Sequence, residues 1–104
     1  MSSPLYTIRM ALEKNSTTWT SADVPAGYIW VVRDISMIWG GLVGASGVIA
    51  IGNTGFFAYD FNPTTTNVAH WDGRAVLEAG EHLDQASSGD GVDFVISGYQ
   101  LSLP

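Results

Sequence analysis

The side chains best suited to chemistry are two histidines and the carboxylates near them. Imidazole and carboxylate groups bind several divalent cations, and His70, Asp72, Glu81 and His82 are the residues that could gather around one. The structural alternative is that His70 packs beside Trp71 while His82 lies on a solvated strand edge. This alternative is favoured, so we predict no metal site and no cofactor.

Other catalytic and ion-binding patterns are weaker. Acyl transfer by serine commonly uses a Gly-x-Ser-x-Gly elbow, and Ser46 in Gly44-Ala45-Ser46-Gly47 is one residue out of that pattern. The chain has no cysteine, which excludes a thiolate nucleophile. The segment from Asp90 to Asp93 offers too few oxygen ligands for calcium and is typical of a solvated turn. We therefore predict that the protein is not an enzyme.

Composition narrows the class of partner. A chain of 104 residues has the size of one domain, and we predict a single domain over residues 1–104, with residues 1–22 as an N-terminal strand or arm packed on it. Ten Asp and Glu against four Lys and Arg give a net charge of −6, which repels a phosphate backbone. Nucleic acid is therefore not an expected partner. The first residues, Met-Ser-Ser-Pro, lack the basic start and apolar core of a secretion signal.

One uncharged stretch is long enough to cross a bilayer. It runs for 25 residues, from Ile35 to Tyr59. Six glycines, Asn53 and Thr54 lie within it, and no basic cluster flanks it. These features favour a buried hairpin, so no membrane partner is expected.

The alternation of apolar and polar residues predicts that the secondary structure elements of this chain are strands. Residues 5–12 alternate as a half-buried strand does, although the Ser3-Pro4 start also suits a helix. The strongest strand signal is Tyr28–Trp39, with one apolar face that Arg33 interrupts; a β-bulge at Arg33-Asp34 would turn both charges toward water. The apolar residues of that face are Ile29, Val31, Ile35, Met37 and Trp39. The other predicted strands are Thr17–Ser21, Val48–Gly52, Phe56–Phe61, Val68–Trp71, Arg74–Leu77, His82–Gln85 and Val92–Leu103.

Turn residues separate these strands. Ala26-Gly27 and Ala79-Gly80 each precede a strand, where a glycine with positive φ permits a sharp reversal. Asp72-Gly73 is typical of a tight turn, and Gly98 is expected to mark a bulge or bend in the last strand. Loops are expected at Gly40–Gly47 and Asn62–Asn67. About eight or nine short strands with this spacing predict an all-β, mainly antiparallel β-sandwich that is jelly-roll-like.

Tryptophan suggests a binding function. Flat indoles stack on sugar rings, which makes Trp19 and Trp71 candidate glycan-stacking residues and a carbohydrate-binding, lectin-like module the alternative function. In a domain this small, aromatic side chains more often belong to the core.

Three segments resemble small virion structural proteins of tailed bacteriophages. They are Val24–Ile35, His70–Glu81 and Ser97–Leu101. Proteins of that kind are non-enzymatic β-sandwich or jelly-roll modules that self-associate, often as trimers, on capsid or tail surfaces. The resemblance implies a homo-oligomer, other virion proteins as partners, and assembly in the host bacterial cytoplasm; capsid decoration and a tail or fibre location both stay open. A host glycan is a further candidate partner.

The apolar, glycine-rich loop after the strongest strand is the candidate subunit interface. Its residues are Trp39, Leu42 and Val43, and a neighbouring subunit could cover them. The alternative is that the loop packs under the sandwich. Substituting Asp for Leu42 and Val43 is expected to break the oligomer if the loop forms the interface.

Overall fold

The computed structural model describes residues 7–39, 45–52, 54–61, 68–88 and 91–104. They contain eight strands and no helix. The helix alternative for the N-terminal segment is therefore wrong over its described part. The strands are β1 Thr7–Ser16, β2 Thr18–Thr20, β3 Tyr28–Ile38, β4 Ala45–Ile51, β5 Thr54–Phe61, β6 Val68–Leu77, β7 Leu83–Ser88 and β8 Val92–Ser102.

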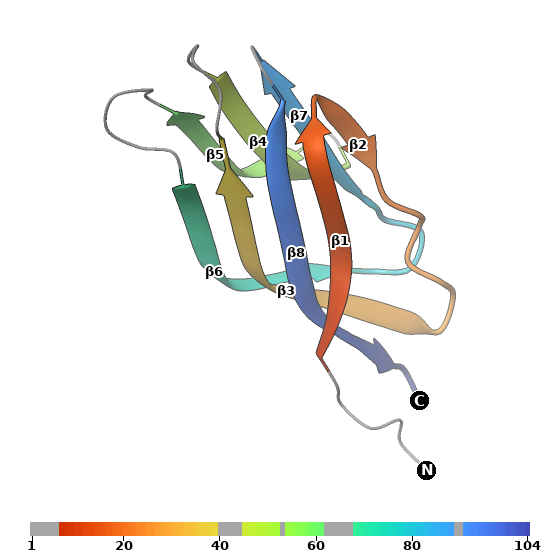
Figure 1. Ribbon diagram of the computed structural model, residues 1–104. Coiled ribbons are helices and arrows are strands. Elements are labelled where there is room, and N and C mark those ends of the chain that lie inside the picture. The colour runs from red at the N-terminus through yellow and green to blue at the C-terminus, as the bar shows by residue number, and fades with distance from the viewer. Residues whose placement is uncertain (1–6, 40–44, 53, 62–67, 89–90) are drawn as a thin grey trace.

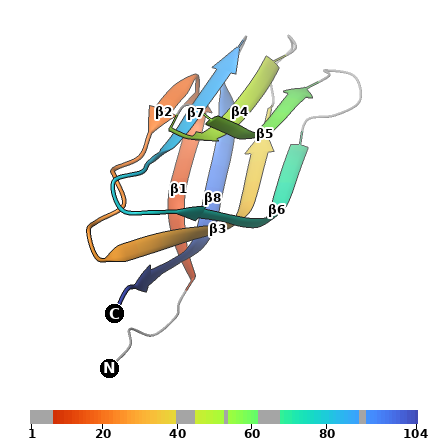
Figure 2. The same ribbon diagram turned by 180° about the vertical axis from the view of Figure 1, so that it is seen from behind.

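The strand order defines an antiparallel jelly roll. The first sheet has the order β1-β8-β3-β6 and the second sheet the order β2-β7-β4-β5 (Figures 1 and 2). The first strand pairs with the eighth, the second with the seventh, the third with the sixth and the fourth with the fifth. One long hairpin rolled into two sheets gives this nested pairing, which is that of the eight-stranded jelly roll. The predicted fold class is confirmed.

The core lies between the two sheets. From the first sheet, Ile35, Met37, Phe94 and Ile96 point inward, and they are buried together with side chains of the second sheet such as Leu83. Each of these five is at most 2% exposed. Alternation along the strands then leaves every second residue of each sheet facing outward.

A row of β-bulges crosses the first sheet at one level. β1 has an extra residue, Met10, opposite the Ser97/Ile96 step of β8, and β3 has an extra residue, Arg33, opposite the Gly98/Ser97 step. Figure 1 shows β3, β6 and β8 turning at this level. The predicted bulge at Arg33-Asp34 is confirmed, and both charged residues are exposed.

Because of the bulge, the residues of β3 that face the core differ from the predicted set. Because the bulge shifts the register by one residue, Val32 joins Ile35, Met37 and Trp39 in the core, while Ile29 and Val31 lie on the other side of the strand.

Two other sequence predictions change in the same region. Asp72-Gly73 is not a turn, because β6 continues from Val68 to Leu77 with two residues, 73 and 74, opposite Arg33. Gly98 lies at the level where β8 turns, as predicted, but it is not a bulge in β8: the alternation continues through it, and the extra residues lie in the neighbouring strands. Gly98 is nevertheless required, since a Cβ there would overlap the carbonyl oxygen of Val31.

The two Ala-Gly turns meet at one end of the sandwich. Gly27 and Gly80 both have positive φ, at 84° and 87°, as predicted. Gly80 N–H donates to the Val24 carbonyl at 3.0 Å, and Val24 N–H donates to the Glu81 carbonyl at 2.8 Å.

The expected loops are only partly described. The Gly40–Gly47 loop is shorter than predicted, because β4 already begins at Ala45. Residues 40–44 and 62–67 lie outside the described residues. The described residues include no helix that could cross a membrane.

Candidate functional site

Large apolar side chains are exposed on one sheet of the described structure. Leu12 is 51% exposed, Ile38 48% and Val68 52%, all on the outer face of the first sheet. Val76, 46% exposed, lies on the same face beyond the bulges, and Leu103, 51% exposed, directly follows β8. Exposed apolar groups gathered on one face are typical of a contact surface.

The outer face of the second sheet has a different character. Apart from the partly buried Val48, its outward residues are small or polar. Two cross-strand hydrogen bonds join some of them: Thr20 Oγ1 donates to Asp84 Oδ1 at 2.9 Å, and the Ser46 and Ser88 hydroxyls lie 2.6 Å apart. These side chains satisfy each other. The first sheet is therefore the better candidate for an interaction surface.

Charge separates the two sheets in the same way. All four Lys and Arg residues lie on strands of the first sheet, together with four of the ten acids, so that sheet is neutral. They are Arg9, Lys14, Arg33 and Arg74 with Glu13, Asp34, Asp72 and Asp93. The other six acids lie elsewhere in the chain without a basic residue, and they account for the net charge of −6.

A hollow on the outer face of the first sheet is small. Its walls include Leu12, Ser36, Ile38 and Val95, and its volume is about 160 Å³. Pockets for drug-sized ligands hold roughly 300–1,000 Å³. This face therefore suits contact with a surface better than enclosure of a small molecule.

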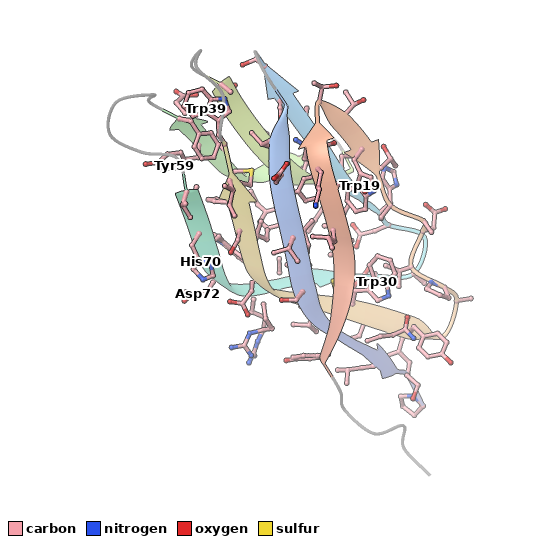
Figure 3. All side chains as sticks on the ribbon, in the orientation of Figure 1. Trp19, Trp30, Trp39, Tyr59, His70 and Asp72 are labelled. Atoms are coloured by element: carbon pink, nitrogen blue, oxygen red, sulfur yellow. The ribbon has the colours of Figure 1, made fainter. Side chains whose placement is uncertain are left out.

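A serine, a histidine and two aspartates meet beside this hollow. Ser36 Oγ lies 3.0 Å from His70 Nδ1, and the opposite ring nitrogen, Nε2, lies 3.5 Å from Asp34 Oδ1 and 4.0 Å from Asp72 Oδ2. Figure 3 shows His70 and Asp72 side by side at the edge strand β6. Sequence reasoning found two of these residues but not Ser36 or Asp34, which the pairing of β3 with β6 brings to them.

The order of this group is that of a nucleophile, a base and an orienting acid, but the surroundings do not support catalysis. The side chains of His70, Asp34 and Asp72 are 50%, 54% and 81% exposed. β3 is paired on both sides, so the backbone N–H groups around Ser36 serve the sheet and form no oxyanion hole. The group is better suited to a polar contact.

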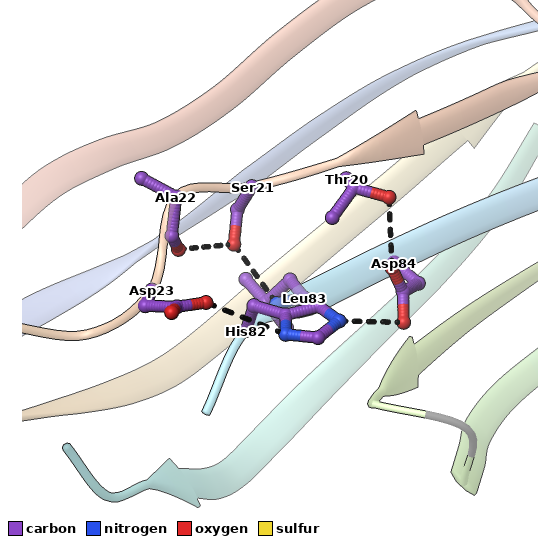
Figure 4. A network of polar contacts seen from close by, with 7 residues as sticks. All are labelled: Thr20, Ser21, Ala22, Asp23, His82, Leu83 and Asp84. Atoms are coloured by element: carbon purple, nitrogen blue, oxygen red, sulfur yellow. Dashed lines mark hydrogen bonds and ion pairs between the residues drawn. The ribbon is translucent and has the colours of Figure 1, made fainter. Parts of the chain in front are cut away.

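The second histidine belongs to a separate network at the turn end of the molecule. His82 Nδ1 lies 3.5 Å from Asp23 Oδ1, and its Nε2 lies 3.3 Å from Asp84 Oδ2 (Figure 4). Nearby, the Ser21 hydroxyl accepts a hydrogen bond from Leu83 N–H at 2.9 Å. These contacts fix the β2–β3 connection against the start of β7.

The four metal candidates therefore do not come together. His70 and Asp72 lie on the outer face of the first sheet, while His82 belongs to the network just described. Glu81 closes a turn, where its Oε1 accepts a hydrogen bond from Glu78 N–H at 2.7 Å. Among the described residues, no group of three or more metal-ligating side chains could hold an ion.

The aromatic site candidates pack inward. Trp39 is 2% exposed and stacks on Phe61 at 6.4 Å, so it belongs to the core and not to a free surface. Trp19 contacts Phe94 edge to face at 5.3 Å, and Trp71 contacts Phe56 in the same way at 5.3 Å.

The remaining candidates add no common platform. Trp19 on β2 and Trp71 on β6 lie at opposite lateral edges of the sandwich, and both are partly buried. Leu42 and Val43 lie outside the described residues.

Comparison with known proteins adds little to this geometry. No protein-family model and no curated protein sequence matches the chain. Among solved structures, a similar one is the crystal structure of dimeric latent PorU from Porphyromonas gingivalis, at 11% identity and a TM-score of 0.41. The match covers 95% of this chain and 10% of that one, so the chain spans about a tenth of the length of PorU. The fold assignment rests on the strand order.

Proposed function

We propose that the protein is a non-enzymatic structural subunit on the surface of a tailed-phage virion. It acts by self-association and by docking to other virion proteins of the capsid or the tail. The jelly-roll strand order supports this proposal, because capsid proteins are among the main users of that architecture. The resemblance of the turn and strand segments to phage virion proteins supports it as well.

One observation carries the proposal. The exposed large apolar side chains of the described residues all lie on or directly beside the first sheet. Burial of such groups contributes roughly 25 cal/mol per Å² of apolar surface, which favours a covered over a bare face. A subunit that docks through one face and leaves the other in water has this asymmetry.

The charges fit the same role. The strands of the first sheet together carry no net charge, while the second sheet and the connections carry the net charge of −6. An acidic outward surface repels other acidic particles and keeps them dispersed. It also disfavours nucleic acid as a direct partner.

The proposal is tested on particles. Particles from a lysate of the source are purified on a density gradient, and an antibody against the purified chain is used to follow it through the fractions and, by gold labelling, in electron micrographs. The chain is expected in the particle band at a fixed ratio to the major capsid protein. Its recovery only among free proteins at the top of the gradient would contradict the proposal.

The docking face is tested with surface variants. Substituting Ser for Leu12, Ile38 and Val68 together is expected to reduce the fraction of chain that rejoins particles lacking it. Substituting Ser for Val48, a partly buried residue of the second sheet, is the matched control and is expected to leave rejoining unchanged. Equal loss in both variants would argue against this face.

A further inference from the structure

We propose that the outer face of the first sheet binds a second copy of this chain about a two-fold axis. In this dimer, Arg33 and Arg74 of one copy lie against Asp34 and Asp72 of the other. We call the first pair the arginine row and the second pair the aspartate row. The inference rests on the self-association proposed above and names its surface and symmetry.

The two rows follow from the bulges. Asp34 and Asp72 are direct cross-strand partners of β3 and β6. Arg33 precedes Asp34 in the bulge and faces residues 73 and 74 of β6, which include Arg74. All four residues are exposed. The arginine row and the aspartate row lie next to each other across β3 and β6. Together they form a strip that is positive on one side and negative on the other.

Within one chain this arrangement is unfavourable. Like charges directly opposite each other destabilise a strand pair. Among the described residues, no ion pair involves Arg33 or Arg74, and the contacts of Asp34 and Asp72 within 4.0 Å are to His70. The strip thus has charges that a partner can neutralise.

A second copy is the partner that fits. A rotation of 180° about an axis that lies between the rows and parallel to them exchanges the two rows. Each arginine row then faces an aspartate row, which is the self-complementarity that a two-fold interface requires. The strands of the two copies run antiparallel across the contact.

The same rotation exchanges the two groups of exposed apolar side chains. Leu12, Ile38 and Val68 lie on one side of the strip, and Val76 and Leu103 lie toward its other side. The rotation therefore brings the first group of one copy to the same side of the axis as the second group of its partner. The charged rows at the centre define one register for the contact.

Edge-to-edge pairing is the competing geometry, and the edges oppose it. The edge strands of the first sheet are β1 and β6, and both have irregular pairing at the bulge row; β1 has a second register shift between Glu13 and Ser16. Bulges in an edge strand disfavour the pairing of that edge with a further strand. A two-fold face contact gives a dimer and not the trimer that the family resemblance implies.

Charge exchange tests the contact. One variant carries R33E and R74E, and the other carries D34K and D72K; each is measured alone and in an equimolar mixture by light scattering after size exclusion. The wild type is expected to be a dimer. Each variant alone is expected to be a monomer, with a dissociation constant raised about 100-fold or more, because like charges then meet across the contact. The mixture is expected to form a one-to-one dimer.

Two controls check that any effect comes from the contact and not from charge in general or from loss of folding. The variant with D60K and E78K changes two exposed acids outside the first sheet, and it is expected to stay dimeric. Circular dichroism and a thermal melt check that each variant folds. If a charge reversal prevents folding, the neutral pair R33Q and R74Q replaces it, with an expected rise in the dissociation constant of about tenfold.

The outcomes separate the two proposals. Dimers of the single charge variants, a mixture that stays monomeric, or a wild-type trimer would overturn the two-fold contact and leave the structural-subunit proposal standing. A wild type that is monomeric at high concentration would overturn the dimer, while the gradient experiment would still decide the virion role. A chain absent from particles but dimeric in solution would refute only the virion role.

Discussion

Gly98 shows how a single residue sets the shape of the first sheet. It lies on the inner side of β8 at the bulge row, where the backbone of β3 approaches closely. A side chain at this position would have to displace the Val31 carbonyl of a central strand, and such a strand is held by hydrogen bonds on both sides. The turn of the sheet therefore depends on the absence of a Cβ.

Substitution of Gly98 by alanine is expected to destabilise the fold strongly. Overpacking commonly costs about 1–3 kcal/mol, and a clash with backbone lies at or above the upper end of that range. We expect a loss of about 3 kcal/mol or more in the free energy of unfolding, measured by urea denaturation with circular dichroism.

Gly80→Ala is the matched control for this prediction. Gly80 has a φ of +87°, but a Cβ there would meet nothing within 4 Å. Its substitution should therefore cost only the backbone strain, about 1–2 kcal/mol. If Gly98→Ala costs no more than Gly80→Ala, the close approach of β3 to β8 does not determine the bend.

At the scale of the elements, a buried glutamine links the two sheets. Gln85 on β7 is 2% exposed and is the one polar side chain buried in the described core. Its Oε1 accepts a hydrogen bond from Ser16 Oγ at the end of β1 at 2.8 Å, and its Nε2 donates to Ser87 Oγ. The amide thus joins the second sheet to the first.

Substitution of Gln85 by leucine keeps the volume and removes these hydrogen bonds. Loss of partners for the serine hydroxyls is expected to lower the free energy of unfolding by about 1–2 kcal/mol. Ser88→Ala removes the exposed Ser46–Ser88 contact and should change stability by less than about 0.5 kcal/mol. A leucine variant as stable as the wild type would show that the amide adds nothing to the union of the sheets.

The aspartate row places stability and association in opposition. Asp72→Asn removes one charge from a like-charged cross-strand pair, so the isolated chain is expected to gain about 0.2–1 kcal/mol. The same change removes a partner for the arginine row, so the dimer should dissociate more readily. The stability of the isolated chain is measured by urea denaturation at a protein concentration below the dissociation constant of the dimer. The dissociation constant itself is measured by sedimentation. Lower stability together with unchanged association would contradict both parts of this argument.

The strands and the first bulge could be predicted from the sequence for a physical reason. Alternation between apolar and polar residues records which face is buried. In a regular strand either Arg33 or Asp34 would point into the core, and an extra residue at this step lets both face water. Asp72-Gly73 could not be assigned in the same way. An Asp-Gly pair satisfies a tight turn and a bulge equally well, and only the pairing with β3 decides between them.

The candidate surface was harder to predict than the fold. Trp39 borders an apolar loop, and this position predicts an interface. In the structure its side chain continues the inward-facing row of β3 and is buried in the core. Leu12, Ile38 and Val68 give no local signal, since each is next to a buried apolar residue in a half-buried strand. The sequence feature that distinguishes the first sheet is the distribution of charge, because every Lys and Arg lies on a strand of that sheet.

At the scale of the whole molecule, this distribution decides how salt acts on the dimer. Two of the six acids outside the first sheet, Asp60 and Asp84, lie on strands of the second sheet, and in a face-to-face dimer the second sheets are on opposite sides of the assembly. Sheets in a sandwich pack about 10 Å apart, so these two groups are separated from their counterparts by more than two sheet spacings across the dimer. The screening length is about 10 Å at 0.1 M salt and roughly 4 Å at 0.5 M. Repulsion between the second sheets of the two copies is therefore already weak at 0.1 M.

Further salt then acts mainly on the paired rows at the contact. We expect the dissociation constant of the wild-type dimer to rise several-fold between about 0.1 and 0.5 M NaCl, measured by sedimentation, because exposed ion pairs are screened over this range. The variant with R33Q and R74Q should lose this dependence, since its aspartate rows have no cations to face. A dimer that tightens as salt is added would point to an interface dominated by apolar contact, because screening would then relieve only the repulsion between two acidic chains.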